Sequence, residues 1–261
     1  KKIYLLFIFL ITFLSGCAVM NEYSDLQRTW YYGKIFVPEF QNTKINTFLI
    51  KDLDKSNNIS DRKLPLVLYL HGCTGLGNFD LLNKIAGEGF VVIAPDSFAR
   101  KFRPLQCDPI NKTGGRNLFV YDFRSAEITY ALEKIGDLSW IDFNNLFIFG
   151  VSEGAVATSL FRGSVFNGRI ITQWTCKGAP LIEGIDAPIN EPILSIIREG
   201  DPYYISSNTK DQSGNCSDYF NGRPNSSSII LPTQTGDLAH DVLTDKKVFN
   251  VIKSFLNMQR R

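Results

Sequence analysis

One stretch, residues 144–163 with the sequence NNLFIFGVSEGAVATSLFRG, most strongly limits how this chain can fold. The apolar run Leu146–Phe149 leads into Gly150-Val151-Ser152-Glu153-Gly154, and small helix-forming residues follow. A glycine two positions to either side of Ser152 leaves room for a strand that turns directly into a helix. The pattern predicts a buried strand, a tight turn that exposes the Ser152 hydroxyl, and a helix whose N-terminus points at whatever that serine attacks.

Short apolar runs recur along the chain and indicate the fold class. They are Leu64–Leu70, Phe90–Ala94, Leu146–Phe149, Ile170–Trp174 and Ile193–Ile197. Apolar runs without polar alternation are typical of strands buried on both faces, as in a parallel sheet covered by helices. Two more polar segments come before them, Tyr31–Val37 and Lys44–Asp52, and they predict an antiparallel pair of strands.

Helices are expected between these strands. Leu81–Ala86 reads as a short helix, Asp122 as the cap of a second helix that closes at Gly136, and Thr244 as the cap of the last helix. Apolar residues recur at helical spacing in the second and last of these. The alternation of strands and helices predicts a doubly wound α/β fold, with a mostly parallel central sheet and helices on both faces.

The first residues indicate an export signal rather than a part of the fold. Two lysines precede the apolar run Ile3–Leu14. As a helix this run would span about 18 Å, which is too short for a hydrocarbon core of roughly 30 Å. Leu14-Ser15-Gly16-Cys17 resembles the lipobox of bacterial lipoproteins, which implies cleavage before Cys17 and lipidation of its thiol.

The expected organisation follows from this leader. Residues 1–16 would be a signal peptide, residues 17–30 a lipidated tether, and residues 31–261 one globular domain. The protein would be exported and held on a bacterial membrane through Cys17, facing the periplasm or the cell exterior. An ordinary secreted or singly anchored protein is the alternative.

The charge balance argues against a nucleic-acid partner. The chain has 28 basic and 26 acidic residues. Loss of Lys1 and Lys2 with the leader takes the basic count from 28 to 26, so the mature chain is formally neutral. A nucleic-acid-binding domain would be expected to carry a basic excess.

Four cysteines remain once Cys17 is set aside: Cys73, Cys107, Cys176 and Cys216. An even number in an exported protein predicts two disulfides, with three possible pairings. We favour Cys73–Cys107 and Cys176–Cys216 over free thiols, because these pairs would hold two long loops, residues 96–121 and 201–228. Loops of that length in a compact domain are usually functional walls or lids.

A serine nucleophile needs a base, and the chain has only two histidines. His71 ends a predicted buried strand, whereas His240 lies in a polar loop before the last helix. In the order Ser, acid, His that is typical of α/β-hydrolases the histidine comes last, so His240 fits and His71 does not. Asp201, which follows Gly200 after a predicted strand, is the expected acid, with Glu199 as the reserve.

An oxyanion formed at the substrate carbonyl needs two backbone N–H donors. Glu153, the residue after the nucleophile, is expected to supply one of them. The loop after the first parallel strand is expected to supply the other, from Cys73 or, failing that, Thr74. A Cys73–Cys107 bond would then hold this oxyanion loop against residues 96–121. The mechanism requires no cofactor and no metal.

These motifs together resemble the dienelactone hydrolase family of α/β-hydrolases. The resemblance runs from about residue 63 to the C-terminus and is carried by Leu70–Gly75, Ala94–Phe98, Gly150–Gly154, Gly200-Asp201 and His240. It implies a sheet of about eight strands and a Ser152–His240–Asp201 triad that acts on a small-molecule ester.

The chain departs from that family at the nucleophile. The namesake enzyme has a cysteine at the position of Ser152, so the serine favours a general carboxylesterase. Glu153 beside the nucleophile also occurs in peptidase-like relatives, which leaves an oligopeptidase-like amide hydrolase open. A catalytically silent lipoprotein that uses the fold as a binding module is the other alternative.

Arginines cluster in and beside the first long loop: Arg100, Arg103, Arg116 and Arg124. Guanidinium groups suit carboxylates and phosphates, so Arg100, Arg103 and Arg116 are candidate substrate-binding residues. The alternative is a solvated loop whose arginines pair with nearby aspartates. Phe98, Phe102 and Phe119 are expected either to line an acyl pocket or to pack in the core.

Overall fold

The computed structural model describes residues 23–38, 46–53, 61–179, 182–205 and 212–261. The predicted signal peptide and Cys17 lie outside these residues. The strands are β1 (Lys34–Val37), β2 (Asn46–Leu49), β3 (Leu64–Leu70), β4 (Val91–Ala94), β5 (Ile141–Val151), β6 (Gly168–Thr172), β7 (Ile193–Arg198) and β8 (Ser227–Leu231). They form one eight-stranded sheet in the order β2-β1-β4-β3-β5-β6-β7-β8.

Most of the sheet is parallel. Only β1 runs against its neighbours β2 and β4, and every pair from β4 to β8 is parallel. All residues of β3, β4, β6 and β7 are buried, which is why β3 and β4 are apolar throughout and none of the four strands alternates between apolar and polar residues. The predicted α/β sheet with a leading antiparallel pair is confirmed.

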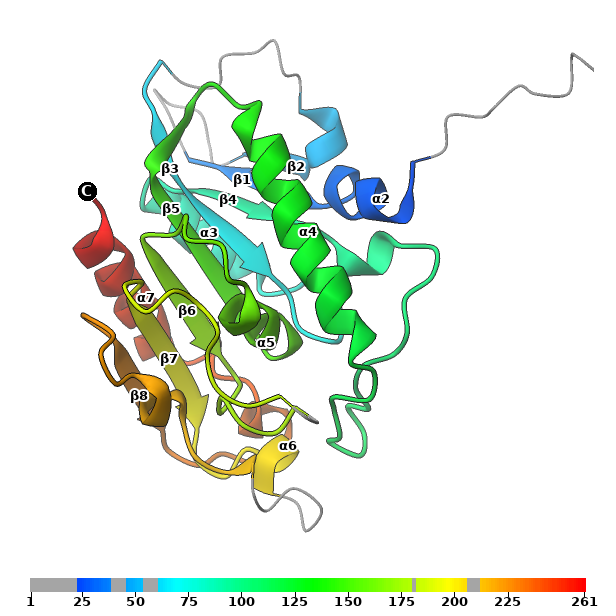
Figure 1. Ribbon diagram of the computed structural model, residues 1–261, viewed down its shortest axis with the longest axis vertical. Coiled ribbons are helices and arrows are strands. Elements are labelled where there is room, and N and C mark those ends of the chain that lie inside the picture. Colours follow the sequence, from blue (N-terminus) through cyan, green and yellow to red (C-terminus); the bar gives the residue numbers. More distant parts are fainter. Residues whose placement is uncertain (1–22, 39–45, 54–60, 180–181, 206–211) are drawn as a thin grey trace, which may run out of the picture.

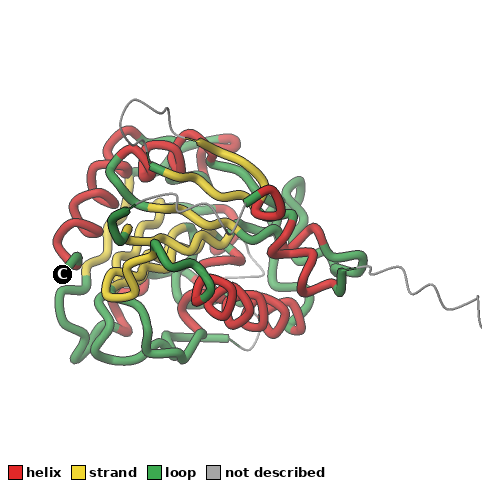
Figure 2. Tube along the Cα trace, turned by 90° about the horizontal axis from the view of Figure 1, so that it is seen from above, coloured by secondary structure: helices red, strands yellow, loops and turns green. Residues whose placement is uncertain are grey.

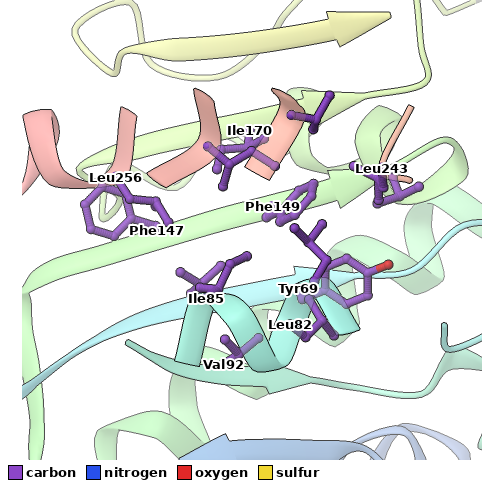
Figure 3. Packing of buried hydrophobic residues seen from close by; sticks show 14 of the residues in the cluster. Tyr69, Leu82, Ile85, Val92, Phe147, Phe149, Ile170, Leu243 and Leu256 are labelled. Atoms are coloured by element: carbon purple, nitrogen blue, oxygen red, sulfur yellow. The ribbon is translucent and has the colours of Figure 1, made fainter. Parts of the chain in front are cut away.

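Helices cover both faces of the sheet. They are α2 (Asp25–Tyr31), α3 (Phe79–Gly87), α4 (Phe119–Gly136), α5 (Glu153–Leu160), α6 (Pro202–Ile205) and α7 (Lys246–Gln259). The core between the sheet and helices α3 and α7 includes Phe147, Phe149 and Ile170 (Figure 3). Helices α2, α4 and α5 contribute to the core of the opposite face, and α4 and α5 lie in front of the sheet in Figure 1.

The N-terminal boundary differs from the sequence prediction. Residues 25–31 form α2 rather than a tether that runs straight into a strand. Ser24 and Gln27 cap this helix reciprocally, and Trp30 is 4% exposed against the rest of the fold. Residues 24–30, which the sequence prediction assigns to the tether, are therefore part of the fold.

Three smaller details also differ. Helix α4 starts at Phe119, so Asp122 lies in its first turn instead of capping it. Asp245, not Thr244, caps α7 by accepting a hydrogen bond from the Lys247 N–H. Ser227–Leu231 form strand β8 directly after the second long loop, although the sequence analysis predicts no strand there. Among the described residues, no helix is long and apolar enough to cross a membrane.

Candidate active site

The turn at Ser152 has the predicted strand–serine–helix geometry. β5 ends at Val151, α5 begins at Glu153, and Ser152 between them has a φ of 53°. A side chain on Gly150 would overlap the Gly154 carbonyl, and one on Gly154 would overlap the Leu70 carbonyl. Both glycines are therefore required by contacts with backbone that cannot move aside.

Ser152, His240 and Asp201 form one hydrogen-bonded chain. His240 Nε2 lies 3.1 Å from Ser152 Oγ, and His240 Nδ1 lies 2.6 Å from Asp201 Oδ2. Because a carboxylate only accepts, Nδ1 carries the proton and Nε2 is free to accept the serine proton. The structure thus brings together the three residues that the chain order predicts.

Backbone and aromatic contacts hold this arrangement in place. Gly200, with φ of 75°, turns the chain after β7 so that Asp201 faces the histidine. Asp201 Oδ1 also accepts the Tyr203 N–H at 3.0 Å, and the Tyr203 ring lies 4.3 Å from that of His240. The Gln173 amide donates to the His240 carbonyl at 2.8 Å. These contacts fix the orientation of the imidazole before substrate arrives.

The proposed oxyanion donors lie at the same point. Cys73 and Glu153 both line the cavity that contains Ser152. A Cβ on Gly72 would lie 3.5 Å from the Ser152 Cβ, so the loop after β3 passes directly beside the serine. Within the described part of the chain, neither the Cys73 nor the Glu153 N–H has a hydrogen-bond acceptor. Both are therefore available to an oxygen bound there.

The cavity at Ser152 has a volume of about 230 Å³, and four aromatic side chains form part of its wall. Tyr121, Trp174, Tyr203 and Tyr204 line it, and the first long loop closes one side. Sequence reasoning missed these four aromatic residues. Trp174 follows the carboxyl end of β6, and the two tyrosines of α6 follow that of β7. Ligands bind at this end of a parallel sheet, so the position of these residues in the sequence could have identified them.

Both predicted disulfides are present, Cys73–Cys107 and Cys176–Cys216. The first joins the oxyanion loop to the long loop that lines the cavity through Gln106, Cys107 and Thr113. Among the residues described here, no group of three or more His, Cys, Asp or Glu side chains is arranged to hold a metal ion.

Removal of the Cys73–Cys107 bond with Cys73→Ala/Cys107→Ala is expected to lower kcat about tenfold or more, because an oxyanion donor loses its support. The free energy of unfolding should fall by about 2–4 kcal/mol. The Cys176→Ala/Cys216→Ala pair is the matched control, since the two bonds close loops of similar sequence separation, 34 and 40. Urea unfolding and ester hydrolysis would measure both effects, and an equal loss of kcat in the two variants would contradict the assignment.

The three arginines expected to bind substrate do not line the cavity. The Arg100 and Arg103 side chains are 8% and 3% exposed and form ion pairs with Glu127 and Glu153. Arg116 pairs with Asp108 at the surface, 3.2 Å away. Arg100 and Arg103 thus supply counter-charges to the buried carboxylates of Glu127 and Glu153, and a substrate-binding role for the three arginines stays a prediction. Phe98, Phe102 and Phe119 are exposed and line neither the cavity nor the core.

Arg124 is the centre of this buried ionic cluster. Its guanidinium donates to the His71 carbonyl at 2.9 Å and lies 3.3 Å from Glu127 Oε2 and 3.7 Å from Glu153 Oε1. It thus links the start of the oxyanion loop to the residue after the nucleophile. Sequence reasoning grouped Arg124 with the loop and did not identify Glu127 as its partner.

His71 is a neutral structural residue. Burial, and secondarily the Arg124 guanidinium, hold the pKa of His71 well below its ordinary value of 6.5. Its Nδ1 donates to the Gly72 carbonyl at 2.7 Å, and its Nε2 accepts the Ser97 N–H at 3.0 Å. These bonds fix the tautomer and agree with the exclusion of His71 as the base.

Comparisons with known proteins agree on the architecture. No family model matches the chain, and no curated protein matches it. A solved structure from Klebsiella pneumoniae, described as a dienelactone hydrolase, is 15% identical with a TM-score of 0.53, over 77% of this chain and 89% of that one. A phospholipase/carboxylesterase from Dyadobacter fermentans is 14% identical with a TM-score of 0.51, over 75% and 91%.

A third similar structure belongs to a larger protein. The acylaminoacyl peptidase of Pyrococcus horikoshii is 13% identical with a TM-score of 0.50, and the match covers 76% of this chain but 38% of the peptidase. At such identities the likeness establishes the fold. The chain has the α/β-hydrolase fold, as its motifs predict.

Proposed function

We propose that this chain is a serine hydrolase that cleaves small carboxylic esters through an acyl-enzyme. The observation that carries the proposal is the hydrogen-bonded chain Asp201–His240–Ser152, whose serine lines the cavity of about 230 Å³. The names of the similar esterase structures support an ester rather than an amide.

The geometry suggests a role for each group. Ser152 Oγ attacks the acyl carbonyl while His240 Nε2 takes its proton, and Asp201 stabilises the resulting imidazolium. The Cys73 and Glu153 N–H groups bind the oxyanion. His240 then protonates the leaving alkoxide, which departs as the alcohol. Water, deprotonated by the same histidine, hydrolyses the acyl-enzyme and restores the free serine.

We also propose that the enzyme is exported and lipid-anchored through Cys17. The support is the arrangement of a short apolar leader followed by Leu14-Ser15-Gly16-Cys17. The two disulfides are in keeping with an oxidising compartment.

Hydrolysis of p-nitrophenyl esters of graded acyl length, beside aminoacyl p-nitroanilides, tests the reaction class. We expect short esters to give the highest kcat/KM, because a cavity of about 230 Å³ admits a small acyl group. Amides should react on the order of 100-fold more slowly or not at all. Faster turnover of the anilides would identify an amide hydrolase. No turnover of either, with no labelling of Ser152 by a fluorophosphonate, would identify a binding module.

A further inference from the structure

The most exposed apolar side chains of the described structure gather in one segment, residues 102–119. Among the described residues, eight large apolar side chains are more than half exposed, and five of these are exposed to 66% or more. Four of the five lie in this segment: Phe102, Leu105, Ile110 and Phe119. The fifth, Met258, lies on α7. Exposed apolar side chains concentrated in one segment mark an interaction site more often than isolated ones do.

This segment is fixed to the rest of the fold by a disulfide and by hydrogen bonds. The Cys73–Cys107 disulfide fixes its middle to the oxyanion loop. Asn117 joins the two ends of the segment: its backbone N–H donates to Gln106 Oε1, and its side-chain amide donates to the Leu105 carbonyl, both at 2.7 Å. The exposed side chains are therefore a fixed surface of the fold.

The segment also lies where the chain enters the domain from the proposed lipid anchor. Asp25, the first residue of α2, accepts the Lys101 N–H at 2.9 Å and the Phe102 N–H at 3.3 Å. Tyr23, the first described residue, is six positions along the chain from Cys17. Fully extended, this stretch covers only about 20 Å. Figure 1 shows α2 and the segment that runs down from beside it on the right side of the molecule, with the C-terminal helix α7 on the left. Figure 2 shows the chain leaving the described structure at the edge opposite to the C-terminus.

We propose that residues 102–119 dock on the surface of the lipid bilayer that holds the anchor, with the side chains of Phe102, Leu105, Ile110 and Phe119 among the headgroups. The inference rests on the proposed anchoring. Of the four basic residues in 101–119, Arg103 is buried against Glu153, whereas Lys101, Lys112 and Arg116 lie at or near the surface. Arg116 pairs with Asp108, the one acidic residue of the segment, and Lys112 with the exposed Asp237, so the surface of the segment keeps a small basic excess that favours an anionic surface. Apolar and aromatic side chains flanked by basic ones are typical of segments that lie in the membrane interface.

Docking would place the active site at the membrane. The same segment lines the cavity through Gln106, Cys107, Thr113, Gly114 and Gly115. The substrate class that suits this position is an amphiphilic ester taken up from the lipid–water interface, with its short acyl group in the cavity.

Quenching of single added tryptophans by brominated lipids tests the docking. Trp30, Trp140 and Trp174 are 4%, 3% and 1% exposed, so the native tryptophans are shielded from quenchers. The full lipidated chain carrying Phe102→Trp or Phe119→Trp would be reconstituted in phosphatidylethanolamine/phosphatidylglycerol vesicles with brominated or plain acyl chains. We expect the fluorescence contributed by the added tryptophan to be about twofold or more lower in brominated vesicles than in plain ones. Met258→Trp is the matched control, because Met258 is 71% exposed but lies on α7. Its fluorescence should be quenched no more than that of the parent protein.

The outcomes separate docking from anchoring and from catalysis. If the protein floats with the vesicles but the loop variants are quenched no more than Met258→Trp, anchoring stands and docking is wrong. Hydrolysis of a soluble ester by the same samples reports the proposed activity independently. A dimer of the Cys17→Ser chain in vesicle-free solution, dissociated by Phe102→Ser/Phe119→Ser, would identify a second copy as the occupant and overturn the proposal.

Discussion

Replacing Ser152 with alanine is expected to lower kcat for ester hydrolysis by about 10⁴-fold or more, because no other group can form the acyl-enzyme. His240 Nε2 would lose the hydroxyl that it contacts at 3.1 Å, while Asp201 would still orient the ring. Alanine has the same Cβ as serine and meets the same backbone at a φ of 53°. The free energy of unfolding should therefore change by less than about 1 kcal/mol.

Ser159→Ala is the matched control for this variant. Ser159 lies on the same helix, α5, but its hydroxyl donates to the Val156 carbonyl at 2.8 Å and takes no part in the cavity lining. Initial rates with a p-nitrophenyl ester, at saturating concentration, would compare the two variants. Parental turnover by the Ser152→Ala protein would rule out the proposed mechanism.

Arg124→Leu is expected to lower the free energy of unfolding by about 3 kcal/mol or more, because it leaves buried carboxylates with one counter-charge fewer. Arg124 and Glu127 have no exposed side-chain surface, and the Glu153 side chain is 2% exposed. Neither Glu127 Oε2 nor Glu153 Oε2 has a hydrogen-bond partner in the described residues, so both carboxylates depend on the nearby guanidinium charges. Urea unfolding would measure the loss.

Arg162→Leu tests whether burial is the cause. Arg162 pairs with Asp186 at 2.8 Å, but the two side chains are 80% and 41% exposed. Loss of this solvated pair should cost less than about 1 kcal/mol. Similar losses in the two variants would show that the buried cluster has no special role in stability.

The sheet and the triad could be predicted because each depends on a local pattern. β3 coincides with its predicted range, Leu64–Leu70, since a strand buried on both faces must be apolar throughout. The triad followed from the glycines around Ser152 and from the presence of only two histidines. The chain order Ser, Asp, His then left one assignment for the base.

The buried ionic cluster could not be predicted, because its partners are brought together only by the fold. Arg103 and Glu153 are 50 residues apart, and charged side chains are expected at the surface unless they are paired. A loop rich in arginine is therefore most simply interpreted as solvated or ligand-binding. Helix α2 was missed for a related reason: its seven residues are too few for a clear amphipathic period, and its helical state depends on docking.

The position of α2 decides where a shortened version of this protein can start. Arg28 Nε donates to the Ala99 carbonyl at 2.6 Å, and Trp30 fills part of the core beneath α4. A chain cut at Tyr31, the boundary that the sequence suggests, would leave a hole in the core and free the base of the loop that borders the catalytic cavity. For purification without the proposed lipid anchor, the cut belongs upstream of Ser24, which keeps the cap of α2 intact.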